Sequence, residues 1–235
     1  YETTGGMDTV AVRMPDHPLA QALIRAGGGY VAAPSANTSG RPSPTMASHV
    51  EEDLDGKIDM ILDGGPVGIG LESTIVDFTE EIPTILRPGY INQEMVRRVI
   101  GQVQMDRGLI QADSKVKPKA PGMKYRHYAP KGNLTIVEGP QEKVTACINE
   151  KLSEGHKQGL KTGVIATDET IEQYQADVKR SLGSRKNEEA IAHHLFQVLR
   201  QMDDEEVQLI FTESFAETGL GQATMNRLLK AAGHT

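Results

Sequence analysis

Leu134-Thr135-Ile136-Val137 opens the part of the sequence whose pattern of strands and helices decides the fold. This run of apolar and β-branched residues predicts a buried strand, and apolar residues at helical spacing follow it over 141–152. The same order then repeats, with strands expected at 163–166 and 207–211 and helices at 187–202 and 223–232. Strands that alternate with helices indicate a parallel sheet covered by helices. We therefore expect a small Rossmann-like parallel α/β domain over residues 133–235.

Upstream of this region, the sequence predicts short elements joined by turns rich in glycine and proline. The expected strands span 8–14, 30–33, 58–62, 73–78 and 84–86, and the expected helices span 17–25, 45–54 and 92–102, with Thr45 as a helix cap. Residues 106–132 lack hydrophobic periodicity and are rich in Lys and Pro, which indicates a linker or an active-site loop. We therefore expect three parts: 1–107, a linker or lid at 108–132, and 133–235.

The composition limits the class of protein. The 235 residues, 38% hydrophobic and 24% charged, suit a soluble globular protein of one or two domains. A formal net charge of −7 argues against a broad nucleic-acid footprint, although a local RNA contact stays open. No apolar run approaches the roughly 20 residues of a membrane helix, so we expect no membrane partner. The single cysteine, Cys147, excludes an intrachain disulfide framework and favours a cytoplasmic location.

Residues 34–43, Pro-Ser-Ala-Asn-Thr-Ser-Gly-Arg-Pro-Ser, carry an unusual density of groups that bind anions. They follow a short apolar run, and open α/β sheets place their ligands in loops at strand ends. Ser35, Asn37, Ser39 and Ser43 can donate to phosphate or carboxylate oxygens. The alternative is a loop that bonds to its own backbone. We call residues 34–43 the hydroxyl loop.

Two further motifs and one arginine suggest the same kind of ligand. Ser73 follows a glycine-rich turn, where small residues let a ligand approach the backbone, although Ser-Thr pairs also begin strands. Arg87 precedes Pro-Gly, and Arg13 ends an expected strand. An arginine in such a place can clamp a carboxylate or phosphate at two points, but Arg13 can equally be a surface cation paired with Asp16. Together these residues suggest a pocket for a phosphorylated or carboxylated small molecule.

The segment Lys124–Pro130 holds His127, two tyrosines and two cations, which suits a lid over an anionic ligand better than a plain tether. His193 and His194 are neighbours on an expected helix and face different ways, so we expect no metal pair there. Metal-ligand signatures, a Walker P-loop and a complete dinucleotide fingerprint are absent from the sequence. Gly219-Leu220-Gly221 can be a helix N-terminus that binds an anion or, more simply, a turn.

Taken together, these motifs resemble the threonylcarbamoyl-AMP synthase family, of the YrdC/YwlC type with a C-terminal extension. The matching pieces are Thr9–Pro15, Pro34–Gly40, Glu72–Asp77, Leu86–Gly89, Ala120–Pro130 and Gly219–Ala231. The resemblance implies that 1–107 is the second half of a twisted-sheet YrdC-like α/β domain. It also implies that the N-terminal part of that catalytic domain is missing from this chain.

The resemblance further implies a nucleotidyltransferase that makes threonylcarbamoyl-AMP and pyrophosphate from L-threonine, bicarbonate and ATP with Mg²⁺. The product would pass to the machinery that threonylcarbamoylates tRNA. The residues implied to contact ATP are Thr9, Ser35, Asn37, Ser43, Arg87 and Tyr128, or alternatively Tyr125. Arg13, Ala33, Pro34 and Ser73 would hold threonine, and Arg87, Ser35 and Asn37 would serve catalysis. The motifs supply no obvious covalent nucleophile and no metal ligand.

Two other functions remain as alternatives. A non-catalytic nucleotide- or RNA-binding module would use the same polar loops without releasing pyrophosphate. Carbamoyl transfer in metalloenzyme maturation is disfavoured, because related domains of that kind bring zinc-finger segments and this chain has one cysteine.

Overall fold

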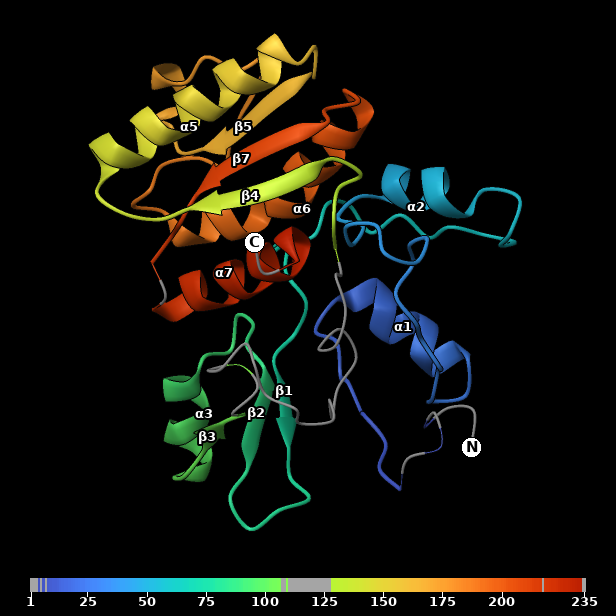
Figure 1. Ribbon diagram of the computed structural model, residues 1–235. Helices are drawn as coiled ribbons and strands as arrows, with labels where there is room; N and C mark the ends of the chain where they lie inside the picture. The colour runs from blue at the N-terminus through green and yellow to red at the C-terminus, as the bar shows by residue number, and fades with distance from the viewer. Residues whose placement is uncertain are drawn as a thin grey trace.

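The computed structural model describes residues 4, 6, 8–106, 109, 128–216 and 218–233. The chain forms two separate sheets, one after the other in sequence (Figure 1). The first contains β1 (Ile75–Asp77), β2 (Thr84–Arg87) and β3 (Gln104–Met105), in the order β1-β2-β3. The second contains β4 (Asn133–Val137), β5 (Thr162–Ala166), β6 (Val178–Ser181) and β7 (Leu209–Glu213), in the order β4-β7-β5-β6.

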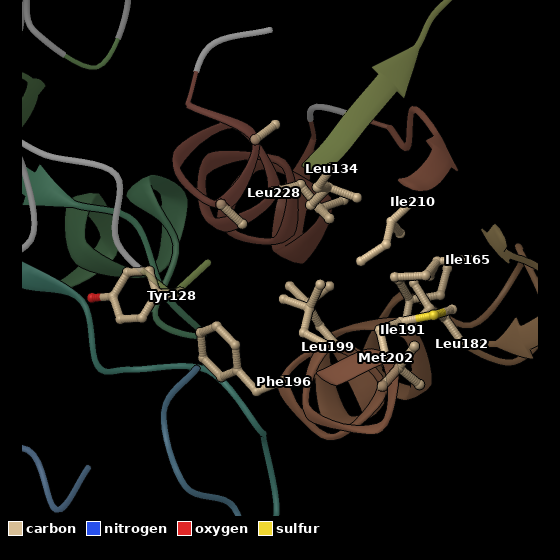
Figure 2. Packing of buried hydrophobic residues seen from close by; sticks show 14 of the residues in the cluster. Tyr128, Leu134, Ile165, Leu182, Ile191, Phe196, Leu199, Met202, Ile210 and Leu228 are labelled. Carbon is tan, nitrogen blue, oxygen red and sulfur yellow. The ribbon is translucent and has the colours of Figure 1, made fainter. Parts of the chain in front are cut away.

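The second sheet is the predicted parallel sheet, since each of its three pairings is parallel. Helix α5 (Gln141–Lys157) covers one face, and α6 (Glu188–Asp204) and α7 (Gly219–Ala232) cover the other (Figure 1). Alternate residues of a strand point to opposite faces. Val164 and Phe211 accordingly pack with α5, while Ile165 and Ile210 pack with α6 and α7 (Figure 2). The expected parallel α/β fold of this region is therefore confirmed.

Some boundaries in this region differ from the prediction. The sequence Val178-Lys179-Arg180-Ser181 has too little apolar character to predict a strand, yet it forms β6 at the edge of the sheet, where charged side chains are tolerated. The short 3₁₀ helix η1 (Ile171–Gln173) was also not predicted. Helix α7 begins four residues earlier than expected, at Gly219.

Three expected strands in the upstream region are wrong. Residues 8–14, 30–33 and 58–62 form no strand, and their apolar side chains face solvent: Val12 is 88% exposed, Tyr30 93% and Met60 74%. Alternation alone does not make a strand, because the backbone N–H and C=O groups must also meet those of a neighbouring strand. In the described ranges these three segments have no such neighbour.

The other upstream predictions are close to the structure. Helices α1 (Pro18–Ala26), α2 (Ala47–Leu54) and α3 (Gln93–Ile100) lie where expected, and β1 and β2 form an antiparallel pair. Thr45 does not cap α2: its backbone N–H donates to His49 Nδ1 at 3.1 Å, and the N-cap residue is Met46. Every helix within the described residues is too short or too polar to cross a membrane.

The glycine-rich turn at 64–70 packs against α6. Gly70 has a φ of +82°, and a Cβ placed there would lie 2.5 Å from the Cα of His193. The His193 ring also hydrogen bonds to the carbonyl of Gly68 through Nδ1, at 3.1 Å. The glycines therefore allow the backbone of the turn to lie close to α6. This contact brings the end of the turn, and Glu72 after it, beside α6 and α7.

Candidate functional site

A partly buried group of charged side chains lies where the β1–β2 hairpin meets α7. Glu72 precedes β1, and Arg87 ends β2. The antiparallel pairing places Arg87 opposite Ile75, so the guanidinium reaches back along β1. Its Nε and Nη2 donate to the carbonyl of Ser73 at 3.1 and 3.0 Å. The hairpin thus fixes the direction of Arg87, which the sequence predicted as a phosphate or carboxylate clamp.

Glu72 joins three segments of the chain. Ser43 Oγ, at the end of the hydroxyl loop, donates to Glu72 Oε1 at 2.5 Å. Arg227 of α7, whose side chain is fully buried, donates from Nε to Glu72 Oε2 at 2.8 Å and from Nη2 to the Glu72 carbonyl at 3.3 Å. Burial alone would raise the pKa of Glu72, but the charge of Arg227 and the hydrogen bond from Ser43 lower it. Glu72 is therefore a carboxylate.

Tyr128 closes one side of this group. Its ring packs against Phe196 of α6 with 5.2 Å between the ring centroids, and its hydroxyl points away from the hydrophobic core (Figure 2). That hydroxyl hydrogen bonds with Arg87. Burial and the nearby Glu72 charge raise the pKa of Tyr128, so the hydroxyl keeps its proton. The following residue, Ala129, donates its N–H to the carbonyl of Gly40 at 3.2 Å and so brings the hydroxyl loop to the same place.

The group carries more positive than negative charge. Arg87, Arg227 and Lys230 act on one another's ionisation, and Glu72 is the carboxylate that faces them. Burial and the charges of Arg227 and Arg87 lower the pKa of Lys230 to about 8. Burial and Arg227 likewise lower the pKa of Arg87. Cations that depress one another's pKa values in a buried place are stabilised when an anion joins them. We call Arg87, Arg227 and Lys230, with Glu72, the cationic cluster.

The structure brings together only some of the predicted site residues. Ser43, Arg87 and Tyr128 meet at the cationic cluster, and Ser73 contributes its carbonyl. Thr9, Arg13, Ala33, Pro34 and Ser35 are exposed, and among the described residues none of them hydrogen bonds to the cluster through its side chain. Tyr125 and His127 lie outside the described residues.

The Asn37 side chain hydrogen bonds to the backbone of its own loop, which is the alternative that the sequence left open. Its Nδ2 donates to the carbonyls of Thr38 and Arg41, at 2.9 and 3.3 Å, and so holds the hydroxyl loop in shape. Its Oδ1 is buried and, in the described part of the chain, has no hydrogen-bond partner. A buried acceptor of this kind suits a donor that a ligand or a water supplies.

Two other motifs have structural roles. The N–H groups of Leu220 and Gly221 donate to Glu188 Oε2 at 3.1 and 3.2 Å, so a carboxylate of this chain occupies the start of α7. His193 binds Gly68, and His194 Nδ1 lies 3.1 Å from the carbonyl of Leu182. Within the described ranges, no group of three or more His, Cys, Asp or Glu residues could hold a metal ion.

The sequence reasoning missed Arg227, Lys230 and the central role of Glu72. One signal was available: Arg227 and Lys230 lie on the same face of α7 as Ala223 and Ala231, which are fully buried. Charged residues at the spacing of an apolar face indicate a buried ionic contact.

The sequence of this chain matches family models over nearly its whole length. Residues 91–233 match the family model described as "Threonylcarbamoyl-AMP synthase, C-terminal domain", and residues 1–89 match the model described as "Telomere recombination". The chain belongs to the threonylcarbamoyl-AMP synthase family. The resemblance seen in the sequence motifs is confirmed.

Relatives and a solved structure cover nearly all of this chain. It is 50% identical to the threonylcarbamoyl-AMP synthase of Bacillus subtilis and 48% identical to that of Pyrococcus abyssi, each over 98% of this chain and over 65% and 66% of the relative. The crystal structure of P. abyssi Sua5 complexed with L-threonine superposes with a TM-score of 0.89 at 47% identity, over 98% of this chain and 66% of that one. The chain thus spans about two thirds of the length of these family members.

Proposed function

We propose that this chain carries out, or is the part of a longer protein that carries out, the synthesis of L-threonylcarbamoyladenylate from L-threonine, bicarbonate and ATP. The observation that carries the proposal is the cationic cluster beside Tyr128 and Ser43. A buried excess of positive charge bordered by hydroxyls suits the phosphates of a nucleotide. Membership of the threonylcarbamoyl-AMP synthase family supplies the reaction, and the P. abyssi relative was crystallised in complex with L-threonine.

The proposed chemistry needs positioning and charge neutralisation more than a nucleophile from the protein. The amine of threonine adds to CO₂ derived from bicarbonate and loses a proton, which gives a carbamate. A carbamate oxygen then attacks the α-phosphorus of ATP, and the bond to the β-phosphate oxygen breaks, so that pyrophosphate leaves. We assign to Arg87 the neutralisation of the charge that grows on the phosphates, because the β1–β2 hairpin and Tyr128 fix its guanidinium.

The remaining roles are proposed from the family resemblance. ATP would contact Thr9, Ser35, Asn37, Ser43, Arg87 and Tyr128; threonine would contact Arg13, Ala33, Pro34 and Ser73. Ser35 and Asn37 would assist Arg87 in catalysis. Of these, Asn37 has the buried free acceptor described above, which suits a donor on the nucleotide.

Mg²⁺ is proposed to arrive with ATP. Glu72, the carboxylate of the cationic cluster, is already held by Arg227 and Ser43, so the donor set suits a metal ion held by phosphate oxygens rather than by protein carboxylates. The ion would supply further neutralisation of phosphate charge when bound. The threonylcarbamoyl-adenylate would pass to the enzymes that modify tRNA, in the cytoplasm.

The deciding experiment measures pyrophosphate release from ATP by the purified chain, with threonine and bicarbonate each omitted in turn. The B. subtilis relative serves as the positive control. Release that requires both co-substrates is the expected result. ATP binding without release would instead favour a non-catalytic nucleotide-binding module.

A further inference from the structure

A second buried ionic contact joins the two regions on the other side of the hydroxyl loop. Arg200 lies on α6, and its side chain is 1% exposed. Its Nη2 donates to Asp53 Oδ2 of α2 at 2.8 Å and to the carbonyl of Pro42 at 2.8 Å, and its Nη1 donates to Asp53 Oδ1 at 3.3 Å. One guanidinium therefore holds both a helix of the upstream region and the backbone of the hydroxyl loop.

Asp53 also binds two further residues of the hydroxyl loop. Its side chain is fully buried, and it accepts the backbone N–H of Thr38 at 3.1 Å and a hydrogen bond from Arg41 Nη1. Burial alone would raise the pKa of Asp53, but the hydrogen bonds from Arg200 and Thr38 lower it. The carboxylate stays ionised and binds three separate donors.

The contacts fix the loop at both ends of its central part. The N–H of Thr38 and the carbonyl of Pro42 are held, and Asn37 closes the turn between them. Ser43 follows Pro42 directly and presents its Oγ to the cationic cluster. A displacement of Pro42 would therefore displace Ser43.

We infer that Arg200 is a positioning residue, which holds the hydroxyl loop in the shape that binds ATP through Asp53 and Pro42. The inference rests on the function proposed above. It gives the C-terminal α/β region a part in nucleotide binding without contact with the substrate. A buried ion pair contributes little net stability compared with a packed apolar pair, so a geometric role is the better explanation of this contact.

The test compares two changes with one control. Arg200→Lys keeps a positive charge but loses the two-point hold on Asp53 and Pro42. The double variant Arg200→Leu/Asp53→Leu removes the whole contact, including the bonds of Asp53 to Thr38 and Arg41, and leaves neither Arg200 nor Asp53 buried without the other. Leu152→Ala is the control, because Leu152 of α5 is buried on the opposite face of the sheet and its loss lowers stability without touching the loop.

Four quantities are measured for each variant: hydrogen exchange in a peptide covering 36–44, kcat, the KM for ATP and the KM for threonine. We expect faster exchange in that peptide and a KM for ATP raised by about tenfold in both Arg200 variants, with kcat and the KM for threonine changed far less. Leu152→Ala should leave all four near their wild-type values.

Each outcome decides one of the two proposals. Unchanged loop exchange in the Arg200 variants, or equal changes in Leu152→Ala, would overturn the positioning role while leaving the proposed function intact. If the wild-type chain releases no pyrophosphate, the proposed function fails. The exchange of residues 36–44 in the Arg200 variants still supports or overturns the positioning role in that case.

Discussion

At the scale of single residues, Glu72 organises the candidate site. Its carboxylate accepts hydrogen bonds from Ser43 and Arg227. The carbonyl of the next residue, Ser73, accepts a hydrogen bond from Arg87. Three donors from three segments are thereby held within a few bonds of each other. The shape of the site therefore depends on a residue that the proposed reaction does not consume.

Glu72→Gln should destabilise the chain, because it leaves Arg227 buried without a counter-charge. The Glu72 side chain is 19% exposed, so we expect a loss of about 2–4 kcal/mol in the free energy of unfolding, measured by urea denaturation. Glu94→Gln, in an exposed pair with Arg97, is the control and should change it by less than about 1 kcal/mol. Equal effects of the two changes would contradict the central role of Glu72.

Lys230 should make ATP binding depend on pH. Its pKa of about 8 means that the ammonium loses its proton as the pH rises, whereas the phosphates of ATP are already ionised above about pH 7.5. The affinity for ATP should fall by about tenfold between about pH 7.5 and about pH 9.5 in the wild type and stay flat in Lys230→Met. Isothermal calorimetry measures both. A parallel fall in the variant would exclude Lys230 as the cause.

The same group should affect the stability of the free chain with the opposite sign. The unfolded chain, in which the pKa of a lysine is 10.5, binds this proton more tightly than the folded state does. The free energy of unfolding should therefore rise with pH between about 8 and 10.5, and Lys230→Met should lack this contribution. Urea titrations at several pH values would show it.

Tyr128→Phe isolates the hydroxyl from the ring. The packing against Phe196 stays, but the hydrogen bond with Arg87 is lost. We expect a change of less than about 1 kcal/mol in stability and a rise of about three- to tenfold in the KM for ATP. An unchanged KM would show that the Tyr128 hydroxyl does not help to set the position of Arg87.

At the scale of elements, α6 and α7 each have two packed faces. One covers the parallel sheet, and the other holds the upstream region through Arg200 and Arg227. The sequence pattern predicted both helices. It could not predict the second face, because helical spacing shows which residues share a side and not what that side meets.

The predicted strands show the same limit, because a sequence pattern does not show which segment a strand will pair with. The alternation of strands and helices after residue 132 was enough to predict a parallel sheet, because each strand there finds a neighbour in the chain. The alternation at 8–14 was equally regular, yet Val12 and Met14 are exposed. Of the site, the sequence predicted Ser43, Arg87 and Tyr128, but not the arginines from α6 and α7 that bind around them.

Gly70 tests the contact between the glycine-rich turn and α6. Gly70→Ala combines a positive φ with a Cβ 2.5 Å from the His193 backbone, so we expect a loss of about 3 kcal/mol or more. Gly65→Ala is the matched control: its φ is +84° but nothing lies within 4 Å, so it should cost about 1–2 kcal/mol. Urea denaturation measures the difference, and equal losses would contradict a close contact.

At the scale of the whole molecule, the hydrophobic core is distributed unevenly. In the described residues, the clusters of buried apolar side chains lie between 128 and 232, with Leu71 as the one upstream member that packs against them. The upstream region depends on that core and on the two buried ionic contacts for its place.

We therefore expect residues 128–235 to fold as an isolated fragment and residues 1–107 to remain largely unfolded. Circular dichroism and the dispersion of amide signals in NMR spectra would measure this for each fragment. A cooperative unfolding transition in the isolated 1–107 fragment would contradict the expectation.

In both ionic contacts between the regions, the acidic and the basic residue come from the same two sides. The acids, Asp53 and Glu72, come from the upstream region, and the bases, Arg200 and Arg227, from the C-terminal helices. Loss of Glu72 alone leaves the buried Arg227 without its carboxylate, and loss of Arg200 leaves the buried Asp53 with Arg41 as its one charged partner among the described residues. A change at one position therefore makes a change at the other advantageous. In a chimera between family members, the upstream region and the C-terminal helices should therefore be compatible only when both pairs are inherited together.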